Sequence, residues 1–145
     1  MILPDVNVLV YAHREDAVGH DEYRDWLASA ISGESAYGMS DLVLSGFLRI
    51  VTHPRIFAVP SPLEDAQAFC EQVREQPNRV SISPGAGHWP IYTRLLRDAG
   101  ARGNLVPDAF LAAMAMEHGC KWITADRDFA RFDGLRCSHP LRPGN

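Results

Sequence analysis

The fold is decided at the amino-terminal end, in the stretch Met1-Ile-Leu-Pro-Asp-Val-Asn-Val-Leu-Val-Tyr11. Its apolar run starts at Ile2, breaks at Asp5 and Asn7 and then resumes, which is typical of a buried strand that ends and turns into a helix. Ligands of open α/β sheets bind beyond the carboxyl ends of the strands, so these two polar side chains are placed for chemistry. The alternative is that Asp5 only caps the following helix, a position that aspartate favours.

The size of the chain predicts a single domain over residues 1–145. With 145 residues, 46% of them hydrophobic, the chain can bury a sizeable core without metal or disulfide crosslinks. No apolar run approaches the roughly 20 residues that cross a bilayer, and the amino terminus has neither the basic flank nor the cleavage site of a signal peptide. We therefore expect a cytoplasmic protein with no membrane segment.

The cysteines predict neither a disulfide framework nor a zinc site. Cys70, Cys120 and Cys137 are odd in number, widely spaced and without a Cys-x-x-Cys pair. We expect thiols that are buried in the core or have no special role.

The charge of the chain argues against nucleic-acid binding through an overall positive field. The formal net charge is -4, so any contact with phosphates must be local. Lys121 is the only lysine, and the other basic side chains that carry a full charge are arginines, which suit bidentate phosphate contacts. Codon bias explains the same skew without any function.

The rest of the chain predicts strands that alternate with helices. We expect helices over about 19–31, 40–51, 63–76, 88–99 and 105–118, and further strands over 36–39, 79–83, 121–124 and 136–138. Ser40 or Asp41 is expected to cap the second of these helices, and Asn104 the last. This alternation favours an α/β fold, a three-layer α/β/α sandwich around a short parallel sheet.

Two further aspartates stand at element boundaries. Asp108 falls in the first turn of its helix, where the helix dipole favours a negative charge, and Asp126 follows the fourth strand. Three carboxylates brought together repel one another unless a cation lies between them, so a divalent metal held by Asp5, Asp108 and Asp126 is the economical hypothesis. Mg²⁺ or Mn²⁺ suits such an all-oxygen site.

Each of these carboxylates also has a structural explanation. Asp108 can be an ordinary residue of the first helical turn, and Asp126 and Asp128 can be turn formers or helix caps. Of the last two, we expect Asp128 to be the cap of a short helix from Phe129 to Phe132 and not a ligand.

Four motifs follow one another over essentially the whole chain: Leu3-Pro-Asp-Val-Asn-Val-Leu-Val-Tyr-Ala12, Phe47-Leu-Arg-Ile-Val-Thr-His-Pro-Arg-Ile-Phe57, Gly103-Asn-Leu-Val-Pro-Asp-Ala-Phe-Leu-Ala-Ala113 and Ile123-Thr-Ala-Asp-Arg-Asp-Phe-Ala-Arg-Phe132. In this order they resemble the motifs of the PIN domain, and specifically of the VapC toxins of bacterial toxin–antitoxin pairs. Each motif is weak alone, and the four together at family spacing are specific.

The resemblance implies a small α/β/α endoribonuclease that depends on Mg²⁺ or Mn²⁺, forms a homodimer and is silenced by a VapB-type antitoxin. Many members cut structured RNA such as tRNA or ribosomal RNA. By resemblance Asp5, Asp108 and Asp126 match three of the family's four acidic positions and are the expected catalytic residues and metal ligands. Asn7 and Thr124 match neighbouring polar supports, expected at the substrate-binding site.

One acidic position of the family departs from its pattern here. Where many members have glutamate before the Phe-Leu-Arg run, this chain has Gly46, so a second metal ion is not expected. Glu22 or Asp41 is the candidate substitute. Pro107 and Pro4 also replace the residues usual before their aspartates, and both leave the carboxylate in place.

The basic residues offer local contacts for RNA. Arg49 and Arg55 have the best claim because they follow a motif segment, and the other candidates are Arg14, His53, Arg94, Arg97 and Arg102. Ordinary surface charge is the competing explanation for most of them. The histidines show no ligand spacing, so we do not expect them to bind metal.

Two other functions fit parts of the pattern. An aspartate after the first strand suits the nucleophile of an aspartyl-phosphate phosphohydrolase, but Asn7 cannot serve as the general acid and no lysine is well placed for the phosphoryl group. A PIN-like module that has lost its metal through Gly46 and binds RNA or protein without cutting is the alternative from another class.

Overall fold

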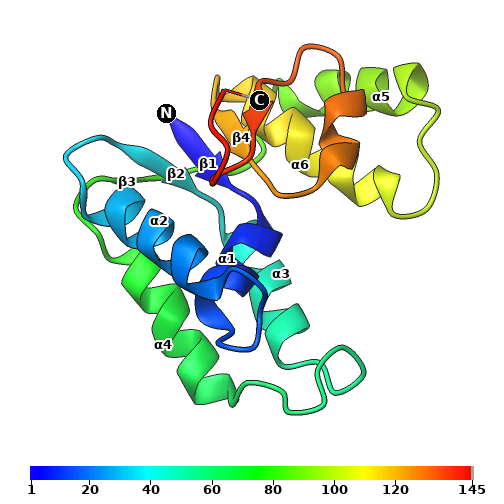
Figure 1. The fold of residues 1–145 in the computed structure, drawn as a ribbon. Helices are drawn as coiled ribbons and strands as arrows, with labels where there is room; N and C mark the ends of the chain where they lie inside the picture. The colour runs from blue at the N-terminus through cyan, green and yellow to red at the C-terminus, as the bar shows by residue number, and fades with distance from the viewer. Residues whose placement is uncertain (145) are drawn as a thin grey trace.

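The computed structural model describes residues 1–144 and places a five-stranded sheet between two groups of helices (Figure 1). All neighbouring strands are parallel, in the order β3-β2-β1-β4-β5. The strands are β1 Ile2–Pro4, β2 Tyr37–Met39, β3 Arg79–Ser81, β4 Lys121–Ile123 and β5 Cys137–Ser138.

The helices form the two outer layers, which confirms the predicted α/β/α sandwich. Their bounds are α1 Val6–His13, α2 His20–Ser32, α3 Asp41–Val51, α4 Leu63–Arg74, α5 His88–Asp98 and α6 Leu105–Glu117, with a 3₁₀ helix η1 over Arg127–Arg131. Helix α1 packs on α2 and α3, and α3 packs on α4, whereas α5 packs on α6 and α6 contacts η1. Figure 1 shows the α1–α4 group and the α5–α6 pair as separate layers.

The strand order creates a switch point between β1 and β4. From β1 the chain moves outward to β2 and β3, and it then crosses back to add β4 and β5 on the other side of β1. Ile2 pairs with Lys121 and Pro4 with Ile123, so both strands end at the same level. The backbone N–H of Asp5 donates to the carbonyl of Ile123 at 2.8 Å. The residues after β1 and β4 therefore enter one crevice, the usual place for a site in such sheets.

The centre of the sheet supplies a rigid base for this crevice. Leu3 of β1 and Trp122 of β4 are fully buried, and the Trp122 ring lies 5.4 Å from that of Phe129 in η1. Helix α6 presents several small buried alanines, which let it lie close to the sheet. Close packing on both faces fixes the positions at which the strands end.

Asn104 stands at the N-cap position of α6 as predicted but does not cap it with its side chain, and the prediction of Asp128 as a cap is wrong. Asn104 makes no side-chain capping bond, because the first N–H groups of α6 already donate to the carbonyls of Arg102 and Gly103 in the preceding turn. The cap of η1 is Asp126 and not Asp128, because the 3₁₀ helix begins at Arg127, two residues earlier than predicted. At α3 the predicted cap is present, since Ser40 Oγ accepts from Leu42 N–H at 3.2 Å.

The thiols agree with the expectation that they form no disulfide. All three are free, with Cys70 and Cys120 buried and Cys137 half-buried. Burial raises the pKa of each, that of Cys70 to about 11, so they remain protonated at neutral pH. None of the helices within residues 1–144 has the length and apolar character that a bilayer crossing requires.

Candidate active site

Asp5 lies between β1 and α1 and is only 5% exposed. Its Oδ1 accepts the N–H of Val6 at 2.6 Å, so it does cap α1. Its Oδ2 accepts from Thr124 Oγ1 at 2.6 Å and from Asn7 Nδ2 at 3.1 Å. Capping therefore does not exclude a role in a site, because the same carboxylate is held in one orientation by three donors.

Asn7 and Thr124 join the start of α1 to the loop after β4. Asn7 Oδ1 accepts the N–H of Ala125 at 3.2 Å, and Asn7 Nδ2 donates to Thr124 Oγ1 at 3.1 Å. Thr124 Oγ1 also accepts the N–H of Asp126 at 3.0 Å. The polar atoms of both side chains are used within the protein, so in this arrangement they orient the two aspartates.

The three predicted aspartates line one cleft of about 340 Å³, called here the acidic cleft. Asp5 enters it from the cap of α1, Asp108 from the first turn of α6 and Asp126 from the cap of η1. The rest of its wall consists of Val6, Asn7, Val10, Tyr11, Ile50, Ile56, Phe57 and Phe129. A larger hollow of about 840 Å³ opens around Met1 and Lys121 and contains none of the three aspartates.

Two of these carboxyls hold their protons unusually tightly. Burial raises the pKa of Asp5 to about 6; hydrogen bonds from Thr124 and Val6 oppose the rise, and the charges of Asp108 and Asp126 add to it. The pKa of Asp108 is also raised to about 6, first by burial and then by the charges of Asp126 and Asp128. A site where carboxylates raise one another's pKa is one where a cation is stabilising.

The chemistry of these side chains fits a hard divalent cation. All three are carboxylates, and Mg²⁺ and Mn²⁺ prefer oxygen ligands. Within residues 1–144, however, no three acidic, histidine or cysteine side chains approach closely enough to hold an ion as they stand. Because Mg²⁺ usually keeps several of its waters, an open ring of carboxylates is compatible with it.

Comparison with known families assigns the chain to one group. The model of the PIN domain matches residues 2–135. The chain belongs to the PIN-domain family. Ribonucleases of this family generally depend on a divalent metal ion, in agreement with the carboxylates of the cleft.

This PIN domain is most informatively compared with curated ribonucleases of Mycobacterium tuberculosis. It is 43% identical to ribonuclease VapC43 over 141 residues, covering 97% of this chain and 96% of the relative. It is 44% identical to ribonuclease VapC25 over 140 residues, covering 97% and 99%. These matches over nearly the full length place the PIN domain among the VapC ribonucleases.

Solved structures of low sequence identity share the fold. VapBC2 from Rickettsia felis, bound to a DNA fragment from its promoter, matches with a TM-score of 0.68 at 21% identity, covering 96% of this chain and 98% of the other. VapC20 of Mycobacterium tuberculosis, described as a toxin that cleaves the sarcin–ricin loop, matches with a TM-score of 0.66 at 17% identity, covering 94% and 99%.

Gly46 of the PIN domain faces the apolar wall of the cleft. It lies one helical turn before Ile50, and a Cβ at this position would lie 3.0 Å from Val6 Cγ2. Val6 therefore occupies the space beside the glycine. Neither candidate substitute lines the cleft: Asp41 is paired with Arg74 at 3.0 Å, and Glu22 lies in the first turn of α2.

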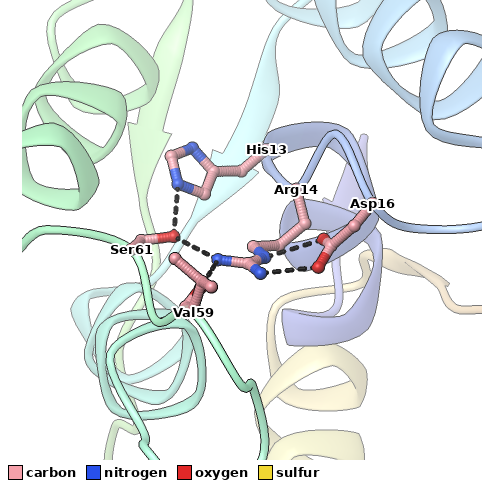
Figure 2. Close-up of polar contacts among 5 residues, drawn as sticks. All are labelled: His13, Arg14, Asp16, Val59 and Ser61. Carbon is pink, nitrogen blue, oxygen red and sulfur yellow. Dashed lines mark hydrogen bonds and ion pairs between the residues drawn. The ribbon is translucent and has the colours of Figure 1, made fainter.

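The predicted RNA contacts lie outside the cleft. Arg49 and Arg55 are exposed and do not line it, although their neighbours Ile50 and Ile56 do. Arg14 is unsuited to RNA because its guanidinium is fully engaged within the protein. Figure 2 shows it between α1 and the loop that leads to α4.

Sequence reasoning missed the network that holds this loop. Arg14 Nε and Nη2 donate to the Asp16 carboxylate at 2.9 and 2.6 Å, and Nη1 donates to the carbonyl of Val59 at 2.8 Å and to Ser61 Oγ at 3.2 Å (Figure 2). The guanidinium also lies 4.0 Å from the centre of the Phe57 ring, which lines the acidic cleft. Arg14 thus positions one wall of the cleft, and the acidic residues that follow it, Glu15 and Asp16, are the only sequence signal for such a pairing.

Proposed function

We propose that this PIN domain, acting as one unit over residues 1–145, is a Mg²⁺- or Mn²⁺-dependent endoribonuclease toxin. The observation that carries the proposal is the convergence of Asp5, Asp108 and Asp126 on one cleft at the switch point of the sheet. The raised pKa values of Asp5 and Asp108 support it, because burial and the neighbouring carboxylates both disfavour the ionised forms and a bound cation stabilises those forms.

The residues of the cleft divide into ligands and positioning groups. Asp5, Asp108 and Asp126 would hold the metal, while Thr124 and Asn7 fix the orientation of Asp5. When bound, a divalent ion supplies a water of lowered pKa and stabilises charge on a phosphodiester in its transition state. In the overall reaction the water oxygen bonds to phosphorus, one P–O bond to ribose breaks, and the released ribose oxygen takes a proton.

The substrate class follows from the relatives and from the cleft. The curated relatives are named ribonucleases, and a VapC of the same fold is described as cleaving the sarcin–ricin loop. We propose structured RNA, either tRNA or ribosomal RNA, with Arg49 and Arg55 as contacts at the rim because they flank Ile50 and Ile56 of the cleft wall.

The expected partners are a second copy of the chain and a VapB-type antitoxin. Several structures of the same fold are toxin–antitoxin complexes, among them VapBC from Salmonella typhimurium and FitAB bound to DNA. Such an antitoxin would keep a cytoplasmic toxin that cuts cellular RNA inactive until it is released. Size-exclusion chromatography with light scattering tests the dimer, and co-purification with a co-expressed VapB-type antitoxin tests the antitoxin.

The decisive experiment incubates purified, partner-free protein with total tRNA and with ribosomes in Mg²⁺, in Mn²⁺ and in EDTA. The expected result is discrete fragments that require metal and disappear in the Asp5→Asn variant. Fragments that persist in EDTA, or in Asp5→Asn, Asp108→Asn and Asp126→Asn alike, would contradict the proposal.

A PIN-like binding module without catalysis is the second candidate, and Gly46 favours it. The wall beside Gly46 is closed by Val6, so no fourth carboxylate reaches the cleft there. Calorimetric titration with Mn²⁺ separates the two functions. Binding that depends on Asp5 supports the nuclease, and absence of binding by a folded sample supports the module.

An aspartyl-phosphate phosphohydrolase is less compatible with the site. Asn7 is engaged by Asp5, Thr124 and Ala125 and has no acidic proton to give. The only lysine, Lys121, lies at the start of β4, and the acidic cleft is at the other end of the strand. Failure to trap a phosphoenzyme would agree with this assignment.

A further inference from the structure

A second hollow of about 420 Å³ adjoins the acidic cleft and differs from it in charge. Asp126 lines both spaces, so they meet at η1. The second hollow also contains the side chains of Arg127, His139 and Arg142, and we call it the basic hollow. Asp126 therefore separates a space lined by carboxylates from a space lined mainly by basic side chains.

The two hollows belong to a longer groove. A third space of about 520 Å³ shares Ala125, His139 and Arg142 with the basic hollow, and it shares Tyr11 and Phe57 with the acidic cleft. An extended ligand can therefore lie in the acidic cleft and continue into the basic hollow without leaving the protein surface.

Arg127 and Arg142 are available to a ligand. In the described part of the chain neither guanidinium makes an ion pair or a hydrogen bond, although both side chains are exposed beside the groove. Arg14, which lines the third space, already donates hydrogen bonds to Asp16, Val59 and Ser61. In a chain of net charge -4, two arginines without a partner among residues 1–144 give the basic hollow a local attraction for anions.

The segment that carries Arg142 is held in place by His139. The backbone N–H of Arg142 donates to the carbonyl of His139 at 3.2 Å, and His139 Nδ1 accepts the backbone N–H of Leu141 at 3.1 Å. His139 Nε2 is bonded to the hydroxyl of Tyr23 in α2 at 3.3 Å. His139 therefore acts as a support for the turn, and the two arginines carry the positive charge.

We propose that Arg127 and Arg142 form a phosphate-binding subsite that holds the RNA backbone next to the phosphodiester in the acidic cleft. The inference rests on the proposed ribonuclease function and adds the residues that place the substrate. A guanidinium group can donate two hydrogen bonds to one phosphate, and the basic hollow adjoins the acidic cleft through Asp126. The subsite offsets the repulsion between the carboxylates of the cleft and the RNA.

The test measures RNA binding and not cleavage. Fluorescein-labelled tRNA is titrated with the full chain in EDTA, and affinity is followed by anisotropy over a range of salt concentrations. Arg127→Gln and Arg142→Gln are each expected to weaken binding about tenfold and to reduce the slope of log affinity against log salt by about one. Arg131→Gln is the matched control, because Arg131 belongs to the same 3₁₀ helix, faces Asp128 at 4.0 Å and does not line the basic hollow.

The outcomes separate the subsite from the nuclease. Weaker binding by both variants, with Arg131→Gln unchanged, supports the subsite whether or not any RNA is cut. Unchanged affinity and salt slope in both variants overturns it, even where tRNA is cleaved in Mg²⁺. Absence of tRNA binding by the parent protein also overturns it. If the variants bind tRNA normally but lose binding to poly-L-glutamate, the basic hollow takes an acidic protein and not RNA.

Discussion

The hydroxyl of Thr124 donates to Asp5 Oδ2 at 2.6 Å and joins two residues that are 119 positions apart in the chain. The contact arises because β1 and β4 are neighbours that end at the same level. It lowers the pKa of Asp5, which burial would otherwise raise further than about 6. The pairing of two central strands thus keeps the buried carboxylate available in its ionised form.

Replacing Thr124 with valine should shift the pH dependence of cleavage. Without the donor, the pKa of Asp5 rises above about 6, so the ionised form is lost at higher pH and the acid limb of the activity profile moves up. Mn²⁺ affinity should fall about tenfold, as is common when the partner of a ligand is removed. Cleavage profiles from pH 5 to 8 and calorimetry measure both effects. Thr124→Ser keeps the hydroxyl and should behave like the parent; an unchanged acid limb in Thr124→Val would refute the role.

Asp108→Asn should abolish cleavage and yet stabilise the metal-free protein. A carboxyl whose folded pKa is raised from 3.8 to about 6 binds its proton more tightly in the folded state, so stability falls as pH rises from about 4 to about 6 and stays lower above that range. The neutral amide removes this loss. At pH 8 in EDTA, we expect a melting temperature higher by roughly 2–4 °C, which corresponds to about 1 kcal/mol after allowance for solvent screening.

The increase in melting temperature caused by Asp108→Asn should be smaller at pH 5, where the Asp108 carboxyl of the parent protein is mostly protonated. Differential scanning fluorimetry at the two pH values checks this, with exposed Asp133→Asn as the control. Saturating Mn²⁺ should stabilise the parent and not the variant, because binding to the folded state adds stability. Equal increases in melting temperature at pH 5 and pH 8 would show that ionisation of the half-buried Asp108 carboxyl is not the cause.

The convergence of the aspartates could be predicted from the sequence because each stands at a boundary between a strand or loop and a helix. Alternating strands and helices of ordinary length imply a parallel sheet, and a parallel sheet gathers the residues that follow its strands at one edge. Asp5 and Asp126 met this condition directly. Asp108 was suggested by its place in a first helical turn, and its role as a ligand stays a prediction together with those of the other two.

Features that depend on side-chain contacts between distant segments could not be predicted. The bonds from Arg14 to Val59 and Ser61 exist because the loop before α4 folds back on α1, and no local pattern encodes that return. The prediction of Asp128 as the cap was wrong because aspartate suits both positions, and the sequence does not show that the 3₁₀ helix begins at Arg127. Arg127 and Arg142 share a hollow only because β5 lies beside β4.

Replacing Arg14 should loosen the wall of the acidic cleft. Arg14→Met removes the donors to Val59 and Ser61, so the free energy of unfolding should fall by about 2 kcal/mol. Arg14→Lys should not restore it, since an ammonium group cannot reproduce the planar fork. Urea denaturation measures the change, and limited trypsin digestion should cut faster after Arg55 in the same loop. Asp16→Asn leaves the contacts to the loop intact and should lower the free energy of unfolding less than Arg14→Met does, because Asp16 is exposed and solvent screens its ion pair. Full recovery by lysine would contradict the argument.

Gly46 and Val6 should show coupled effects on metal binding. A side chain at position 46 meets Val6 Cγ2 at 3.0 Å, so Gly46→Glu alone should lower the melting temperature as Val6 is displaced. In a Val6→Ala background the space beside position 46 is open. Helix α3 is then more stable, because a glycine has been removed from its interior. The double variant should then add a carboxylate to the apolar wall. Calorimetry should show that it binds Mn²⁺ about tenfold more tightly than the parent, or that it binds a second equivalent.

The control is Gly46→Gln with Val6→Ala, which has the same shape without the charge and should bind Mn²⁺ like the parent. If the double variant with glutamine binds Mn²⁺ as tightly as the double variant with glutamate, the increase in affinity comes from packing. The wall beside Gly46 then does not face the metal.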